Sequence, residues 1–189
     1  MTAHAPTFAP TSWTACDSPL GPLHLAADAR GLVGVWFTGQ KHYDGPEPGW
    51  TQDDRQPLLI EAAAQLRDWF AGRGRDFDLP LAPRGTAFQQ AVWREIARVG
   101  WGRTRSYGEV ATAIGRPAAV RAVGAATGRN PISLIVPCHR LVGRDGALTG
   151  YAGGLDRKRA LLAFEAGQPA LWTEVDLLES TPNEAGVPA

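Results

Sequence analysis

The amino-acid sequence predicts a small α/β N-terminal domain, made of a sheet and a helix, followed by a mainly α-helical C-terminal domain that contains a helix-turn-helix. Two short β-type runs, residues 23–27 and 32–37, flank a turn-rich link and predict a hairpin. Apolar residues over 56–71 recur at helical spacing. Beyond Gly85, two helical patterns are joined by a short turn with Gly and Pro, which is the pattern of a helix-turn-helix.

The N-terminal elements have clear limits in the sequence. Residues 1–10 are expected to form a loose leader, and residues 11–80 the α/β domain. The stretch from Gln40 to Asp54 is rich in Gly, Pro and Asp and is expected to be a loop. The helix over 56–71 stops at Gly72-Arg73-Gly74.

Capping signals place the first helices of the second domain, which is expected to cover residues 81–168. Thr86 is a candidate N-cap for a helix with apolar residues on one side. Ser106 and Glu109 match a capping box, in which the serine side chain accepts from the Glu109 amide and the glutamate reaches back. That helix is expected to run to about Ile114.

Two further helices complete the domain. Pro117 suits the first turn of a helix that extends to about Thr127. Asp156 is a candidate cap for the last helix, which Gly167 ends. Residues 169–189 contain Pro and acidic residues and are expected to form a poorly packed tail.

The strongest chemical signal is the segment Pro137-Cys138-His139-Arg140, which follows the apolar run 132–136. The run is expected to be a buried strand that Pro137 ends. The strand would deliver a thiol, an imidazole and a guanidinium into a turn, where a base or positive charge promotes the reactive thiolate. The alternative is that Cys138 is only a small buried hydrophobe. Adjacent strand residues face opposite ways, so His139 can serve Cys138 only from a turn or through a water.

The charge is distributed unevenly, although the formal net charge is +0. Residues 84–160 hold 13 Lys+Arg against 4 Asp+Glu, and the rest of the chain holds 6 against 15. This asymmetry indicates that one half faces a polyanion, the alternative being an ordinary solvated surface.

Several classes of protein are disfavoured. The two cysteines are far apart and the four histidines are scattered, which argues against a zinc site and a disulfide framework. No apolar stretch approaches the roughly 20 residues that span a bilayer, and the N-terminus lacks a signal pattern. The sequence therefore predicts a cytoplasmic protein with no membrane association.

The helix over 118–127 is unusual because Arg121 is its only charged residue and most of the others are Ala, Gly and Val. One face is expected to pack on the core. The other face could enter a groove of DNA; the alternative is a helix buried in the core with Arg121 extending to solvent.

From about Gly85 to Glu165 the chain resembles the O6-alkylguanine-DNA alkyltransferase family, also called methylated-DNA–protein-cysteine methyltransferases. The resemblance covers about 80 residues. The matching segments, in order, are Gly85-Thr86-Ala87-Phe88-Gln89 with Val92-Trp93, Ser106-Tyr107-Gly108, Arg121-Ala122-Val123-Gly124, Asn130-Pro131, Pro137-Cys138-His139-Arg140, and Gly150-Tyr151-Ala152-Gly153-Gly154 with Lys158. Asp17 to Leu23 also resembles the start of the family's first domain.

The resemblance implies irreversible, single-turnover transfer of the alkyl group from O6-alkylguanine in duplex DNA to Cys138. The family connects a glutamate, a histidine, a water and the cysteine, which correspond to Glu165, His139 and Cys138. Tyr107 is expected to donate to guanine N3. The carbonyls of Cys138 and Leu141 are expected to accept from the exocyclic amine.

The resemblance also implies how DNA is bound. The recognition helix is expected to enter the minor groove while the lesion is flipped out and Arg121 takes its place. The expected DNA-binding residues are Arg121, Ala122, Gly124, Thr127 and Ser106. The expected substrate pocket comprises Asn130, Leu141, Tyr151, Ala152, Gly153 and Lys158. The resemblance implies no metal and no cofactor, and we expect a monomer.

Three other functions compete with this one. An alkyltransferase-like binding protein would flip the lesion without accepting the group, but such relatives lack the cysteine that is present here. A Cys-His hydrolase would need an oxyanion hole and a histidine that is usually distant in sequence. A helix-turn-helix regulator would carry Cys138 as an inert buried residue.

Overall fold

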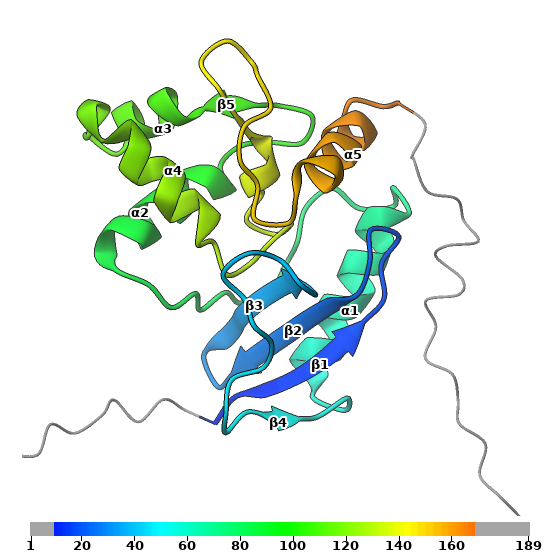
Figure 1. The fold of residues 1–189 in the computed structure, drawn as a ribbon. Coiled ribbons are helices and arrows are strands. Elements are labelled where there is room, and N and C mark those ends of the chain that lie inside the picture. Colours follow the sequence, from blue (N-terminus) through cyan, green and yellow to red (C-terminus); the bar gives the residue numbers. More distant parts are fainter. Residues whose placement is uncertain (1–9, 169–189) are drawn as a thin grey trace, which may run out of the picture.

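The N-terminal half is a four-stranded sheet with one helix packed against it (Figure 1). The computed structural model describes residues 10–168; most of the expected leader, residues 1–9, and the expected tail, residues 169–189, lie outside this range. The elements are β1 (Ser12–Cys16), β2 (Leu23–Asp28), β3 (Gly31–Phe37), β4 (Thr51–Gln52) and α1 (Pro57–Phe70). The order across the sheet is β3-β2-β1-β4, and only the β1–β4 pair is parallel.

The predicted hairpin is confirmed as β2 and β3, whose residues pair from Leu23 opposite Phe37 to Asp28 opposite Gly31. The sequence analysis does not identify β1. It assigns β4 to the loop over 40–54, because both residues of this strand are exposed and show no apolar alternation. The predicted helix is confirmed as α1, and the Gln56 side chain caps its first turn by accepting from the Leu59 amide.

The C-terminal half contains the remaining helices and two short strands. Its elements are α2 (Ala87–Ala97), β5 (Arg105–Ser106), α3 (Tyr107–Ala113), the 3-10 helix η1 (Pro117–Ala119), α4 (Val120–Gly128), the 3-10 helix η2 (Cys138–Arg140), β6 (Leu141–Val142) and α5 (Leu155–Glu165). The predicted capping box of α3 is present, and Thr86 caps α2 in the same way. Helices α3 and α4 pack together in the order that the sequence predicts, joined by a turn that contains η1.

The predicted strand over 132–136 is wrong. Only Ile132 bridges to the sheet, opposite Val35. The chain then curls back on itself, with the Val136 amide donating to the Ile132 carbonyl at 2.9 Å, and Leu134 has a positive φ of 70°. The run is apolar because most of it is buried, with Ile132 0% and Leu134 1% exposed, so its composition reflects burial in a turn.

Two helix starts also differ from prediction. Pro117 begins η1 rather than α4 itself. Asp156 lies inside α5, whose N-cap is Gly154 with φ 94°, and no side chain caps that helix. Glycine adopts this φ without strain, so Gly154 forms the turn that leads into α5. Asp156 does not cap the helix.

The two halves share one buried core, to which the sheet, α1 and the C-terminal helices all contribute. The edge strand β3 supports the curled segment directly: the Val35 amide donates to the Pro131 carbonyl, and the Ser133 amide donates to the Val35 carbonyl, both at 2.8 Å. The N-terminal sheet therefore fixes the segment that leads to Cys138. No helix within residues 10–168 is long and apolar enough to cross a membrane.

Truncating a core side chain of the sheet should destabilise the protein strongly. Phe37 is fully buried, so Phe37→Ala is expected to lower the free energy of unfolding by about 3–5 kcal/mol. Ile60→Ala is the control, because Ile60 is 52% exposed and its truncation should change that free energy by about 0.5 kcal/mol or less. Urea denaturation of both variants measures the difference, and equal losses would contradict this description of the core.

Candidate active site

Cys138 lies at the start of η2, where hydrogen bonds from Asn130 hold the turn. Cys138 is only 3% exposed. The Asn130 side-chain amide donates to the Val136 carbonyl at 2.8 Å and to the Cys138 sulfur at 3.2 Å. Its oxygen accepts from the Ile132 amide at 3.1 Å. Asn130 thus ties the curled segment to the thiol, and it contacts the nucleophile directly.

A buried carboxylate joins two basic residues of η2. Glu165, at the end of α5, lies 2.9 Å from Nε2 of His139 and accepts two bonds from Arg140, at 2.9 Å from Nε and 2.8 Å from a terminal nitrogen. Arg140 also donates to the Val99 carbonyl. The sequence analysis considers Arg140 only as a positive charge near the thiol and does not foresee its contacts with Glu165. Its contacts orient Glu165, which in turn orients His139.

The protonation states follow from burial and these contacts. Burial lowers the pKa of His139, and the charges of Arg140 and Lys158 add to this, against the opposing effect of Glu165. Burial alone would raise the pKa of Glu165, but the bonds from His139 and Arg140 hold this pKa below its ordinary value. The imidazole is therefore neutral and the carboxylate ionised near neutral pH.

This arrangement sets the tautomer of His139. An ionised carboxylate can only accept hydrogen bonds, so the imidazole proton lies on Nε2, which faces Glu165. The other ring nitrogen, Nδ1, is then an acceptor; it is buried and has no hydrogen-bond partner within residues 10–168. His139 therefore presents a free lone pair, as a general base must.

The thiol itself is protonated at rest. Burial raises the pKa of Cys138, and bonds from Asn130 and two backbone amides, together with the charge of Lys158, offset this only in part. Of the two means of activation that the sequence analysis names, a base or a positive charge, the charge of Lys158 does not suffice to ionise the thiol at rest. Cys138 needs a base that takes its proton as the reaction proceeds.

Lys158 is a fully buried cation beside this centre. Its ammonium group donates to the Leu141 carbonyl and, at 2.7 Å, to the Thr149 carbonyl. Burial lowers the pKa of Lys158 to about 8. The Leu141 carbonyl, expected from the resemblance to accept from guanine, already accepts from Lys158 and retains one lone pair for a second donor.

A cavity of about 600 Å³ opens beside the catalytic turn. Its lining includes four residues that the sequence analysis assigns to substrate or DNA, namely Tyr107, Gly124, Tyr151 and Ala152. Cys138 does not line it. The Tyr151 ring, which lines the cavity, has its centroid 6.5 Å from that of the His139 ring, so the cavity lies near η2.

Gly153 explains how Tyr151 reaches that position. Gly153 is buried, and a Cβ added there would lie 2.7 Å from the Tyr151 ring and 3.3 Å from Phe37. A side chain at this position would displace the tyrosine. Gly153 therefore shapes the pocket because its lack of a side chain leaves space for the Tyr151 ring.

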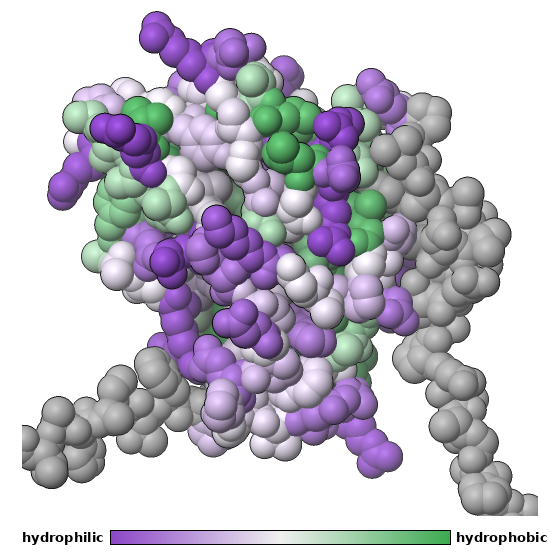
Figure 2. Space-filling view, in the orientation of Figure 1, coloured by the Kyte–Doolittle hydropathy of each residue, from purple (hydrophilic) through white to green (hydrophobic). Residues whose placement is uncertain are grey.

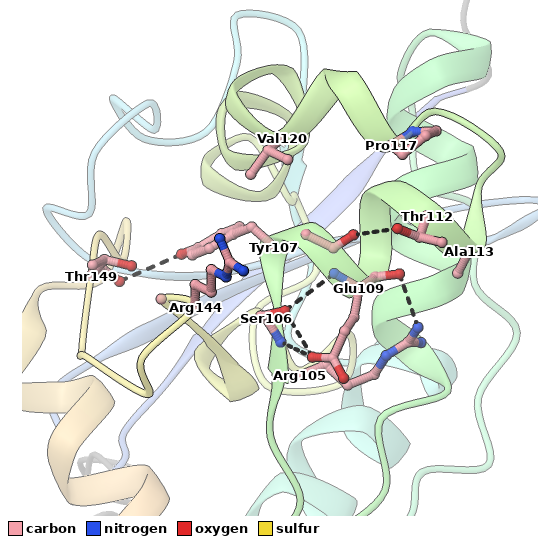
Figure 3. A pocket seen from close by; sticks show the side chains of 12 residues that line it. Arg105, Ser106, Tyr107, Glu109, Thr112, Ala113, Pro117, Val120, Arg144 and Thr149 are labelled. Carbon is pink, nitrogen blue, oxygen red and sulfur yellow. Dashed lines mark hydrogen bonds between the residues drawn. The ribbon is translucent and has the colours of Figure 1, made fainter.

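A second cavity, of about 870 Å³, lies on another side of Tyr107 (Figure 3). Figure 3 shows the Tyr107 hydroxyl turned toward Thr149; this hydroxyl donates to the Gly150 carbonyl at 3.2 Å. Ser106 and Arg144 also line this cavity. The Ser106 hydroxyl donates to the Glu109 carboxylate and accepts from the Glu109 amide, as the cap of α3.

Helix α4 presents part of its expected surface to solvent. Arg121 and Ala122 are exposed and Gly124 is partly exposed. Thr127 is a correction: the sequence analysis counts it among the DNA-binding residues, but it is 5% exposed and its hydroxyl donates to the Val123 carbonyl at 2.8 Å. One face of α4 packs on the core, and Thr127 lies on that face.

Neutral, buried His139 should make stability depend on pH. Its folded pKa lies below the ordinary 6.5, so its stabilising contribution is present above that pH and is lost as the pH falls through the folded pKa. Glu165, whose pKa is also lowered, adds a loss below about 4.5. We expect His139→Gln to flatten the decline of the unfolding free energy between roughly pH 7 and 5.

Urea denaturation across this pH range provides the measurement. His24→Gln is the comparison, because burial also lowers the pKa of His24 although its side chain is only part-buried. This variant should remove a smaller share of the slope than His139→Gln does. An unchanged slope in His139→Gln would contradict a lowered pKa of His139 in the folded state.

Comparison with known proteins identifies the family. The description "6-O-methylguanine DNA methyltransferase, ribonuclease-like domain" matches residues 12–83, and "6-O-methylguanine DNA methyltransferase, DNA binding domain" matches residues 87–167. A methylated-DNA–protein-cysteine methyltransferase of Methanosarcina acetivorans is 49% identical over 150 residues, which is 79% of this chain and 94% of the relative. One of Mycobacterium bovis is 49% identical over 149 residues, 79% and 88% of the two chains.

A solved structure supports the same conclusion. The crystal structure of Mycobacterium tuberculosis OGT in complex with DNA matches with a TM-score of 0.78 and 45% identity, and the match covers 88% of this chain and 99% of that one. The resemblance seen in the sequence is thereby confirmed along almost the whole described chain. The chain belongs to the 6-O-methylguanine DNA methyltransferase family.

Proposed function

We propose that this protein repairs O6-alkylguanine in duplex DNA by transferring the alkyl group to Cys138, once per chain. The observation that carries the proposal is the buried Cys138, His139 and Glu165 group, in which Glu165 fixes a neutral imidazole with one free acceptor nitrogen. The relatives named methylated-DNA–protein-cysteine methyltransferases support it.

In the proposed reaction, Nδ1 of His139 takes the thiol proton through a water, and the sulfur attacks the alkyl carbon. The bond between that carbon and guanine O6 breaks, and its electron pair stays on the purine. Tyr107 donates a hydrogen bond or a proton at guanine N3. Burial raises the pKa of Tyr107, which keeps the hydroxyl protonated and able to donate.

The product is a thioether, so the reaction ends there. Cys16 is the other thiol, and it lies at the end of β1 in the N-terminal sheet, in a different part of the fold. Both cysteines are free, and a reducing compartment suits such thiols. We therefore infer that the protein is cytoplasmic. We also infer that it acts as a monomer and without a cofactor.

The proposed DNA-binding surface centres on α4. Its exposed side chains are small apart from Arg121, which suits close approach to a minor groove. The lesion would leave the stack, at a cost of a few kcal/mol, and enter the cavity beside Tyr151, while Arg121 fills the gap. Residues 11–80 would support the site and residues 81–168 would carry DNA binding and transfer.

Intact-protein mass spectrometry tests the transfer. After incubation with duplex DNA that carries O6-methylguanine, each chain should gain the mass of one methylene and no more, even with excess substrate. Cys138→Ala should gain nothing, whereas Cys16→Ala should react normally. Binding without a mass gain would favour a binding protein, and continued turnover would contradict the single-use mechanism.

Arg121 should matter only when the base is paired. Arg121→Ala is expected to slow transfer from duplex DNA by about tenfold or more, since it would lose roughly 1–3 kcal/mol of support for the flipped state. Reaction with a free O6-alkylguanine base should be unchanged. Arg55→Ala, which removes an exposed arginine of the N-terminal half, is the control, and equal losses on both substrates would rule out the proposed role.

A further inference from the structure

One wall of the cavity beside Tyr151 comes from the N-terminal half of the chain. Lys41 and His42, in the loop between β3 and β4, line it together with residues of α4 and of the 149–152 segment. The Lys41 amide donates to the Ala152 carbonyl at 2.9 Å. The loop is therefore bonded to the segment that encloses the cavity.

The loop is anchored on both sides of these two residues. Before them, the Gln40 side chain is buried, and its oxygen accepts from the Phe37 amide at 3.0 Å and from the Ser133 hydroxyl at 3.2 Å. After them, Tyr43 stacks on Trp36 with ring centroids 4.4 Å apart and planes 1° from parallel. The Tyr43 hydroxyl also lies 2.9 Å from Nδ1 of His24.

Between these anchors the backbone is strained. His42 has a φ of 67°, in the left-handed region that residues other than glycine rarely adopt. Such strain persists only where the surroundings hold it, and it concentrates at ligand-binding sites. The anchors thus hold two exposed basic side chains, Lys41 and His42, at the cavity rim.

The charge around the cavity has one sign. Its lining includes Lys41, His42 and Arg129 and contains no Asp or Glu. Within residues 10–168, neither the Lys41 nor the Arg129 side chain has an ion-pair partner, whereas Arg30, Arg73, Arg84, Arg98, Arg105, Arg140 and Arg159 do. Glu47 is the only acidic residue lining the adjoining groove, which these three basic residues share. Figure 2 shows hydrophilic side chains gathered over this loop.

We propose that Lys41 and His42 bind the phosphodiester backbone of the lesion-bearing strand, next to the extruded nucleotide, so that the N-terminal half forms part of the DNA-binding surface. This proposal rests on the proposed function. A base that enters the cavity leaves its flanking phosphates at the rim, where cations without partners and no carboxylate favour them.

The test measures equilibrium binding of a Cys138→Ala background to lesion-bearing duplex DNA over a range of salt concentrations. Adding Lys41→Ala should weaken binding about three- to tenfold and reduce the salt slope by about one, as expected for one lost phosphate contact. Lys41→Arg should retain both properties. Arg55→Ala, another exposed cation of the same half, should leave them unchanged.

His42→Gly separates the side chain from the backbone strain. Glycine adopts the positive φ without strain, so this variant should be more stable than the parent protein. Because it also lacks the imidazole, a phosphate contact by His42 predicts that it binds duplex DNA more weakly. A second readout, in proteins that retain Cys138, is transfer from a free O6-alkylguanine base. That rate should be the same in wild type, Lys41→Ala and His42→Gly.

The outcomes distinguish this proposal from the proposed function. If the Lys41→Ala and His42→Gly variants bind duplex DNA as the Cys138→Ala background does, the backbone contact is wrong. If both variants lose reaction with the free base to the same extent as reaction with duplex DNA, the loop shapes the pocket and the proposal fails. If wild type transfers no alkyl group but Lys41→Ala still reduces the salt slope, the proposed function fails and the contact stands.

Discussion

The pairing of Glu165 with both His139 and Arg140 is the interaction on which the site depends. Burying a carboxylate is costly unless it is paired and fully hydrogen-bonded, and here Arg140 supplies two bonds while His139 lies 2.9 Å away. Because the bonds from His139 and Arg140 keep Glu165 ionised, Glu165 can fix the imidazole in the tautomer that leaves Nδ1 free to accept. The same contacts join α5 to η2, so the carboxylate of Glu165 both orients the imidazole and connects these two elements.

The N-terminal sheet contributes more than a support at a distance. Its edge strand β3 pairs with the segment just before Cys138 through Val35, and Gln40 adds a side-chain bond to Ser133. The same loop places Lys41 and His42 at the rim of the cavity. Because the turn that carries Cys138 has no regular strand of its own, these contacts hold its shape.

The buried thiol reconciles stability with reactivity. A protonated Cys138 is a neutral buried group and costs little, whereas a permanent thiolate in this environment would be destabilising. The free Nδ1 of neutral His139 is available to accept the thiol proton when it moves. Tyr107 and Tyr151 line the open cavity, whereas Cys138 does not.

The sequence by itself determined the hairpin, α1, the N-cap of α2, the capping box of α3, and the family, because these depend on local spacing and on ordered motifs. Tertiary structure decided the rest. The apolar run 132–136 is a buried turn of which only Ile132 bridges to β3, and Thr127 faces inward because α4 packs on the core. Arg140, Gln40 and Lys41 are positioned by partners between 25 and 111 residues away, contacts that no local pattern encodes.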